Sequence, residues 1–150
     1  SDTIAHEFFH ALRYRPAEIE LLYGTPVVSG WFELMPEWVR NLYYTELSAE
    51  QWYSLYDKSY TAEGNGSDDT VWFSRAYSRL DPSEDMATVF EEMCDDSGGD
   101  ILKYSHLGVK ARYLAVIIRL CYPSCTDAAP LPWEKNISVD MHEFDSIVFP

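Results

Sequence analysis

The sequence predicts a mainly α-helical fold, and three features favour it. Apolar residues recur at helical spacing in several segments, residues typical of helix starts precede these segments, and strand signals are few. Hydrophobic residues make up 47% of the chain and aromatic residues 15%, which is typical of a globular protein and argues against disorder. At 150 residues, the chain is long enough to bury one core, so we expect a single domain.

The first predicted helix opens the chain, with Asp2 or Thr3 as its N-cap. It should end within residues 13–15, because Pro16 disfavours helical geometry in the residue before it. Its apolar stripe consists of Ile4, Phe8, Ala11 and Leu12.

Two short helices should follow. Pro16 suits the first turn of a helix that runs to Tyr23 and stops at Gly24. Residues 25–31 fit either a short strand or an ordered loop. Pro36 can start another helix. The apolar side of that helix would hold Trp38, Val39, Leu42 and Tyr43.

The middle of the chain holds one further helix signal and a loop. Ser48 and Gln51 are spaced as a capping box, which predicts a helix through Tyr56. Residues 62–70 are rich in Gly, Asn, Asp and Ser, so we expect a loop there. Residues 71–73, Val-Trp-Phe, should return the chain to the core.

The second half contains the two longest predicted helices. One starts at Asp81–Pro82, runs through Met93 and ends within residues 95–99. The other covers residues 105–121 and is apolar enough to be buried on more than one side. After Pro123 the chain should be irregular.

Residues 6–10 read His-Glu-Phe-Phe-His, the HExxH pattern. Positions i and i+4 lie on one face of a helix, so His6 and His10 can place two imidazoles on one metal ion. Glu7 projects beside them, where a carboxylate can take a proton from a metal-bound water. Zinc is the usual metal for such a set, so we expect Zn²⁺. The alternative is a chance match on an amphipathic helix.

A catalytic zinc needs a third protein ligand. Arg13 and Pro16 stand where a metzincin has Gly and His, which excludes that class. Glu33 is one candidate, but Pro36 disfavours a continuous helix through Glu33 and Glu37. Glu84 is the better candidate because it lies in the first turn of a predicted helix.

Both acids at the start of that helix also have structural interpretations. Glu84 follows Asp81 by three residues, so the two can form a capping box instead. Asp85 fits a solvated acid that favours the helix dipole, or a carboxylate that holds a ligand imidazole by its other N–H.

Residues 77–87 resemble the second motif of gluzincins related to anthrax lethal factor and to a group of bacterial zinc metallopeptidases. In that group, a tyrosine precedes the ligand glutamate by seven residues, as Tyr77 precedes Glu84 here. Asp85, Ala87 and Phe90 also match. Thr88 differs, since the group usually has a second glutamate at that position.

The resemblance implies a zinc metallopeptidase of gluzincin type. His6, His10 and Glu84 would hold zinc, Glu7 would act as general base, and Tyr77 would stabilise the oxyanion. The fold would be the zincin-like catalytic helical part, with few strands and its upstream sheet missing from this chain. We therefore expect residues 1–150 to form a single metallopeptidase-like domain, a fragment of a longer protein. An upstream segment or a second chain would complete it.

The alternative function is a non-catalytic binding module, stabilised by zinc or descended from a peptidase whose site has decayed. Such a module would present aromatic side chains to a partner. The candidates are Trp31, Phe32, Trp38, Tyr43 and Tyr44.

The charge of the chain narrows its partners. A formal net charge of −14 disfavours nucleic acid and anionic membranes, and no apolar run reaches the length of a membrane span. We expect a peptide or protein substrate, and the net charge favours a basic or neutral one. A secreted or cell-surface location follows from the resemblance. Cys121 and Cys125 fit either a disulfide or two thiols.

Overall fold

The computed structural model describes residues 3–44, 47, 50, 56–97 and 99–150, and these residues confirm the mainly helical prediction. The α-helices are α1 (Thr3–Leu12), α2 (Tyr14–Tyr23), α3 (Gly30–Glu33), α4 (Glu37–Arg40), α6 (Pro82–Met93), α7 (Ser105–Cys121) and α8 (Asp145–Val148). The 3₁₀ helices are η1 (Ala62–Gly64), η2 (Ala76–Arg79), η3 (Asp100–Lys103), η4 (Pro123–Cys125) and η5 (Pro132–Glu134). Within the described ranges no strand forms, and one isolated parallel bridge joins Thr61 to Phe73.

α1 and α2 follow each other with almost no break. α2 begins at Tyr14, so the predicted start at Pro16 is two residues late. The helical path continues because the carbonyl of Leu12, four residues before the proline, accepts a hydrogen bond from the Tyr122 hydroxyl at 2.7 Å instead. Gly24 ends α2 in the left-handed conformation, at φ 70°, as expected of a C-terminal glycine.

Residues 25–29 lead through a turn into α3, to which Gly30 and Trp31 already belong, so this segment is not a strand. The carboxylate of Glu20 accepts hydrogen bonds from the backbone N–H groups of Val28 and Ser29, at 2.6 and 3.0 Å. The Glu20 side chain thus satisfies two backbone N–H donors, which would need a neighbouring strand if this segment were part of a sheet.

The helix predicted after Pro36 is shorter than expected. α4 ends at Arg40, while the buried Tyr43 lies beyond it. Residues 62–70 form a loop that opens with η1, as predicted. The predicted capping box of Ser48 and Gln51 lies outside the described residues.

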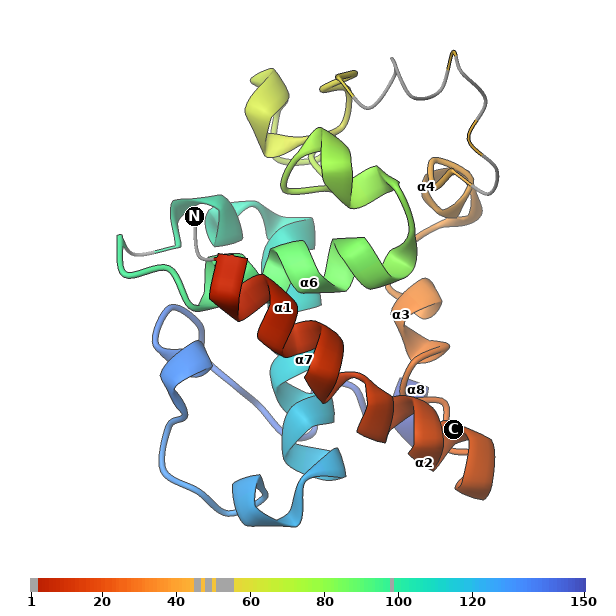
Figure 1. Ribbon diagram of the computed structural model, residues 1–150, viewed down its shortest axis with the longest axis vertical. Coiled ribbons are helices and arrows are strands. Elements are labelled where there is room, and N and C mark those ends of the chain that lie inside the picture. Colours follow the sequence, from red (N-terminus) through yellow and green to blue (C-terminus); the bar gives the residue numbers. More distant parts are fainter. Residues whose placement is uncertain (1–2, 45–46, 48–49, 51–55, 98) are drawn as a thin grey trace.

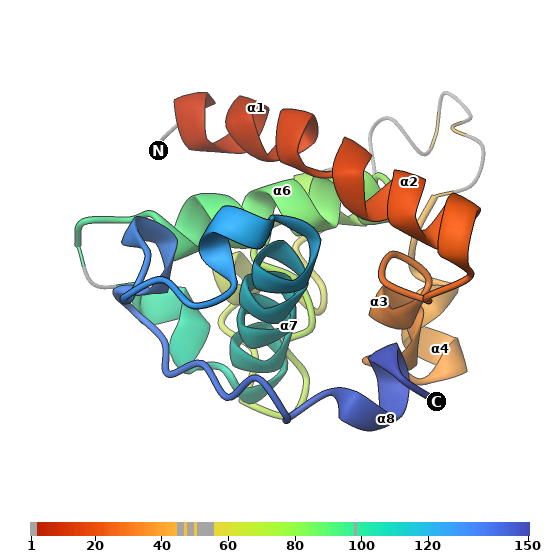
Figure 2. The ribbon, with the colours of Figure 1, turned by 90° about the horizontal axis from the view of Figure 1, so that it is seen from below.

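The core lies between α1, α6 and α7. α1 packs across α6, and α7 runs behind both helices and also contacts α2 (Figure 1). Seen from below, α1 and α2 form one long ridge above α6, and α3, α4 and α8 lie together at one side (Figure 2). α7 is buried on more than one side, as predicted. The largest fully buried apolar side chains include Trp31, Phe73, Phe90, Leu107 and Tyr113.

A buried ion pair joins α6 to α7. Lys110 Nζ donates to Asp85 Oδ2 at 2.8 Å and to the carbonyl of Trp72 at 2.6 Å. Tyr43 donates to the same carboxylate oxygen, and Trp31 Nε1 donates to the Tyr43 hydroxyl at 3.0 Å. Burial raises the pKa of Asp85 and lowers the pKa of Lys110, and each charge opposes the shift of the other.

The sequence left the state of Cys121 and Cys125 open and predicted no membrane-spanning segment. Cys121 and Cys125 form no disulfide in the described structure. Burial raises the pKa of the Cys121 thiol to about 11, so this thiol is an inert core group. No helix within the described part of the chain has both the length and the apolar character needed to cross a bilayer.

Replacing Lys110 should destabilise the fold strongly. In Lys110→Met, Asp85 stays buried without its cation, which should cost about 3–5 kcal/mol of unfolding free energy. Urea unfolding, followed by tryptophan fluorescence, measures this loss. Lys103→Met is the control, because Lys103 pairs with Asp100 at the surface and should contribute under about 1 kcal/mol. A Lys110→Met protein as stable as the control would contradict the role given to the buried pair.

Candidate metal centre

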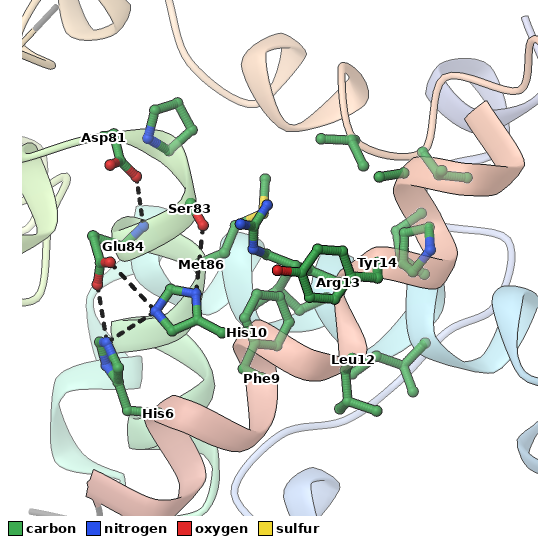
Figure 3. Close-up of a pocket in the computed structure, with 18 of the residues that line it drawn as sticks. His6, Phe9, His10, Leu12, Arg13, Tyr14, Asp81, Ser83, Glu84 and Met86 are labelled. Carbon is green, nitrogen blue, oxygen red and sulfur yellow. Dashed lines mark hydrogen bonds and ion pairs between the residues drawn. The ribbon is translucent and has the colours of Figure 1, made fainter. Parts of the chain in front are cut away.

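Three potential ligand side chains converge where α1 crosses α6. Nε2 of His6 lies 2.9 Å from Glu84 Oε2, and Nε2 of His10 lies 3.3 Å from Glu84 Oε1 (Figure 3). The two imidazole Nε2 atoms are themselves 3.3 Å apart. All three groups offer an atom within 4.8 Å of the others, which is the arrangement of a candidate metal site.

These separations match the size of a zinc ion. Zinc bonds to nitrogen and oxygen are about 2.0–2.2 Å long, so two ligands at the tetrahedral angle lie about 3.4 Å apart. The observed separations of 2.9–3.3 Å are slightly shorter, and the two histidines face different oxygens of Glu84, so binding one ion requires a small rearrangement of these side chains. Two imidazoles and one carboxylate are also a donor set that zinc accepts.

Glu84 takes part in both arrangements that the sequence left open. Asp81 is the N-cap of α6, and its side chain accepts a hydrogen bond from the backbone N–H of Glu84 at 2.9 Å. The Glu84 side chain turns the other way, toward the two histidines. The cap therefore uses the backbone of Glu84 and leaves its carboxylate available as a ligand.

The other candidate acids lie elsewhere. Glu33 is exposed in α3 and lies 3.8 Å from Arg40. Asp85 is fully buried and faces Lys110 and Tyr43, so it is neither a solvated acid nor a support for an imidazole. Both interpretations of Asp85 are wrong for the same reason: a buried lysine from α7, distant in sequence, holds its carboxylate in the core.

Glu91 stands in the place that Asp85 was expected to fill. Its Oε2 lies 3.8 Å from Nδ1 of His6, and that nitrogen is buried without a hydrogen-bond partner. Arg75 Nη1 donates to the same carboxylate oxygen at 2.7 Å and compensates its charge. Sequence reasoning missed Glu91, although it lies seven residues after Glu84 and hence on the same face of the helix.

Thr88 contributes no carboxylate here. Its hydroxyl donates to the carbonyl of Asp85 at 2.8 Å and lies 2.7 Å from the Ser78 hydroxyl. On the outer side of the cluster, Ser83 Oγ lies 3.5 Å from Nδ1 of His10. The second nitrogen of each imidazole thus faces a group that can orient the ring.

The cluster opens onto a cavity of about 670 Å³, lined by Glu7 and Tyr77 as well as by the three ligand candidates. Glu7 is exposed on α1, directly after His6. The Tyr77 ring centroid lies 6.2 Å from that of His6. Partial burial raises the pKa of the Tyr77 hydroxyl, and the charge of Glu84 adds to this, so the hydroxyl keeps its proton and can donate.

The far end of the cavity is mostly apolar. Val27 and Val28 line it from the turn before α3, and further apolar lining residues come from α1, α2, α6 and α7. Those of α6 and α7 include Met86, Leu114, Ile117 and Ile118. A polar cluster at one end and apolar walls beyond it are typical of a small-molecule or peptide-side-chain site.

Comparison of the chain with protein-family models, with curated proteins and with solved structures finds no match in any of the three.

The zinc content of the protein tests the ligand set. We expect about one zinc per chain for the native protein, and we expect Glu84→Ala to lose most of it because only two imidazoles remain. Elemental analysis after dialysis measures both. Glu33→Ala should keep its zinc, since Glu33 lies outside the cluster. Zinc retained in Glu84→Ala would show that the ligand set is wrong.

Glu91 should strengthen zinc binding through His6. Glu91→Gln should weaken zinc binding by about 10- to 100-fold, because an amide supports the Nδ1–H of His6 less well than a carboxylate. Competition with a zinc-sensitive dye measures the affinity. Glu92→Gln removes the same charge from the next residue and should leave the affinity unchanged. Equal affinities for the two variants would rule out a specific role for Glu91.

Proposed function

We propose that this chain hydrolyses peptide bonds as a zinc-dependent peptidase of gluzincin type. The observation that carries the proposal is the convergence of three side chains, two from an HExxH helix and one from α6, at the polar end of a cavity. His6, His10 and Glu84 would hold the zinc ion. The matching separations of their ligand atoms support this assignment.

Each remaining group has a separate chemical task. A zinc ion at this site supplies a water of lowered pKa and polarises a substrate carbonyl. Glu7 accepts the proton of the attacking water and later delivers it to the leaving amine. The Tyr77 hydroxyl, which keeps its proton, donates a hydrogen bond to the oxygen that gains negative charge.

The surroundings of the ligands favour a catalytic site over a structural one. Among the described residues the cluster contains three ligand groups, whereas a structural zinc site is usually closed by four. The acid beside the ligands, Glu7, is exposed and lines the cavity. A general base in this position has no use in a structural site.

The binding-module alternative has less support. It relied on exposed aromatic side chains, but Trp31 and Tyr43 are buried in the core and joined by a hydrogen bond. Trp38 is half exposed and stacks edge-on against Trp72. The described structure therefore offers no continuous surface formed by the expected aromatic set.

Glu7→Gln tests the mechanism directly. The variant should bind zinc like the native protein, because Glu7 is not a ligand, and should lose at least about 100-fold of its peptidase rate. Mass spectrometry of a mixed peptide library measures cleavage, and elemental analysis measures zinc. Glu18→Gln, an exposed acid of α2 paired with Arg15, should keep full activity. An active Glu7→Gln protein would exclude Glu7 as the base.

A further inference from the structure

The basic side chains of this protein are almost all paired. The chain contains 11 Lys and Arg residues and 25 Asp and Glu residues, and all of the basic ones are described. Every one of them except Arg13 lies within 4.0 Å of a carboxylate oxygen of a described residue. Because the chain has more than twice as many acids as bases, a guanidinium that no described carboxylate neutralises is unexpected, and it indicates a separate role for Arg13.

Arg13 lies on the same face of the helical ridge as the metal ligands. His6, His10 and Arg13 occupy positions i, i+4 and i+7, which stack along one side of a helix. The helical path still holds at Arg13, since its backbone N–H donates to the carbonyl of Phe9 at 3.0 Å. Its side chain lies one turn beyond His10.

The Arg13 side chain faces the cavity. Arg13 is among the residues that line it, together with the three ligand candidates. The close-up draws Arg13 among the residues that line the cavity (Figure 3). Its Nε atom is buried and has no hydrogen-bond partner, and its Cζ lies 5.3 Å from the centre of the Tyr14 ring. The aromatic ring can support the charge, but it satisfies none of the N–H donors.

The acids that line the cavity together with Arg13 do not pair with it. Glu84 faces the two histidines, Asp81 caps α6, and Glu7 does not come within ion-pair distance of Arg13. The donors of Arg13 thus remain available to a ligand. A guanidinium offers a planar fork of donors that matches a carboxylate, and such charge-assisted bonds are about twice as strong as neutral ones.

We propose that Arg13 is a carboxylate-binding subsite of the peptidase proposed above, one helical turn beyond its zinc ligands. The subsite selects peptides that present a carboxylate near the bond to be cleaved. That carboxylate is either the carboxyl terminus of the peptide or an Asp or Glu side chain. The net charge of −14 predicted basic or neutral substrates. Surface charges farther away than about 8–10 Å are screened by salt, however, so the Arg13 cation inside the site determines which substrate charge is preferred.

The test uses small ligands that need no turnover. Succinic, glutaric and adipic monohydroxamates each carry a zinc-binding hydroxamate and a carboxylate at increasing separation, and their primary amides lack only the charge. Titration calorimetry on the zinc-loaded protein should find at least one acid that binds about 10- to 100-fold more tightly than its amide. Arg13→Gln should abolish this preference and leave the affinity for the amide unchanged.

Two further variants separate this role from a general effect. Arg13→Lys keeps the charge but not the planar fork, so it should retain part of the preference. Arg15→Gln is the matched control: Arg15 lies two residues away, pairs with Glu18 at the surface and does not line the cavity. That variant should keep the full preference. Thermal unfolding should give the same Tm for Arg13→Gln as for the native protein, because Arg13 has no ion pair with any described residue to lose.

The outcomes are distinct. The subsite is overturned if the native protein binds acid and amide equally well, or if Arg13→Gln still prefers the acid. In either case, binding of zinc and of the hydroxamates would still support the metal centre. A protein that binds neither zinc nor any hydroxamate would overturn the metal centre, and the subsite with it.

A second set of ligands identifies the source of the carboxylate. Binding to zinc-loaded Glu7→Gln is compared for peptide pairs that differ only in a terminal carboxylate or amide, and for amidated pairs that differ only in an internal Glu or Gln. Preference for the terminal acid assigns an exopeptidase that acts at the carboxyl end. Preference for the internal Glu assigns an endopeptidase that acts beside acidic residues. Absence of both preferences would overturn the subsite.

Discussion

The buried pair of Asp85 and Lys110 is the interaction on which the rest of the structure depends. Two opposite charges without water are tolerable only at close contact and with their other donors and acceptors largely satisfied. Lys110 meets this condition through Asp85 and the carbonyl of Trp72. On the acid, Oδ2 also accepts from the Tyr43 hydroxyl, whereas Oδ1 is buried without a hydrogen-bond partner among the described residues. The pair therefore sets the first turn of α6 against α7 and against the segment that follows α4.

The same helical turn also positions the candidate site. Consecutive residues of an α-helix point about 100° apart, so Asp85 can enter the core while Glu84 faces α1. Glu84 reaches His6 and His10 from a turn that is capped by Asp81 and anchored by Asp85. Ligands carried by packed helices are held more accurately than ligands on loops, which suits a site that needs a defined geometry. Glu91, two turns further along α6, faces His6 from the same helix.

Charge is distributed unevenly over this acidic protein. Most basic side chains compensate nearby carboxylates, and two of the buried ones, Lys110 and Arg119, pair with acids that are buried as well. The cavity is different, because Arg13 lies at the edge of the candidate metal centre and pairs with no carboxylate of the described residues. The net charge of the chain describes its long-range field, whereas recognition at contact distance depends on the few groups that line the site.

The sequence by itself determined the helical class, the long buried helix α7 and the pairing of His6 with His10, because each follows from a local repeat of three to four residues. It also singled out Glu84, through the start signal of α6 and the resemblance of residues 77–87 to gluzincins. Only the tertiary structure decided what those signals become. The N-cap of Asp81 and the ligand position of Glu84 exist together because backbone and side chain point in different directions. Asp85 is buried because Lys110 of α7 pairs with it, and Glu91 faces His6 of α1 while Arg75, just before η2, pairs with its carboxylate. Arg13 lies near no carboxylate of a described residue, because the acids that line the cavity face other groups. No spacing along a single segment encodes such contacts.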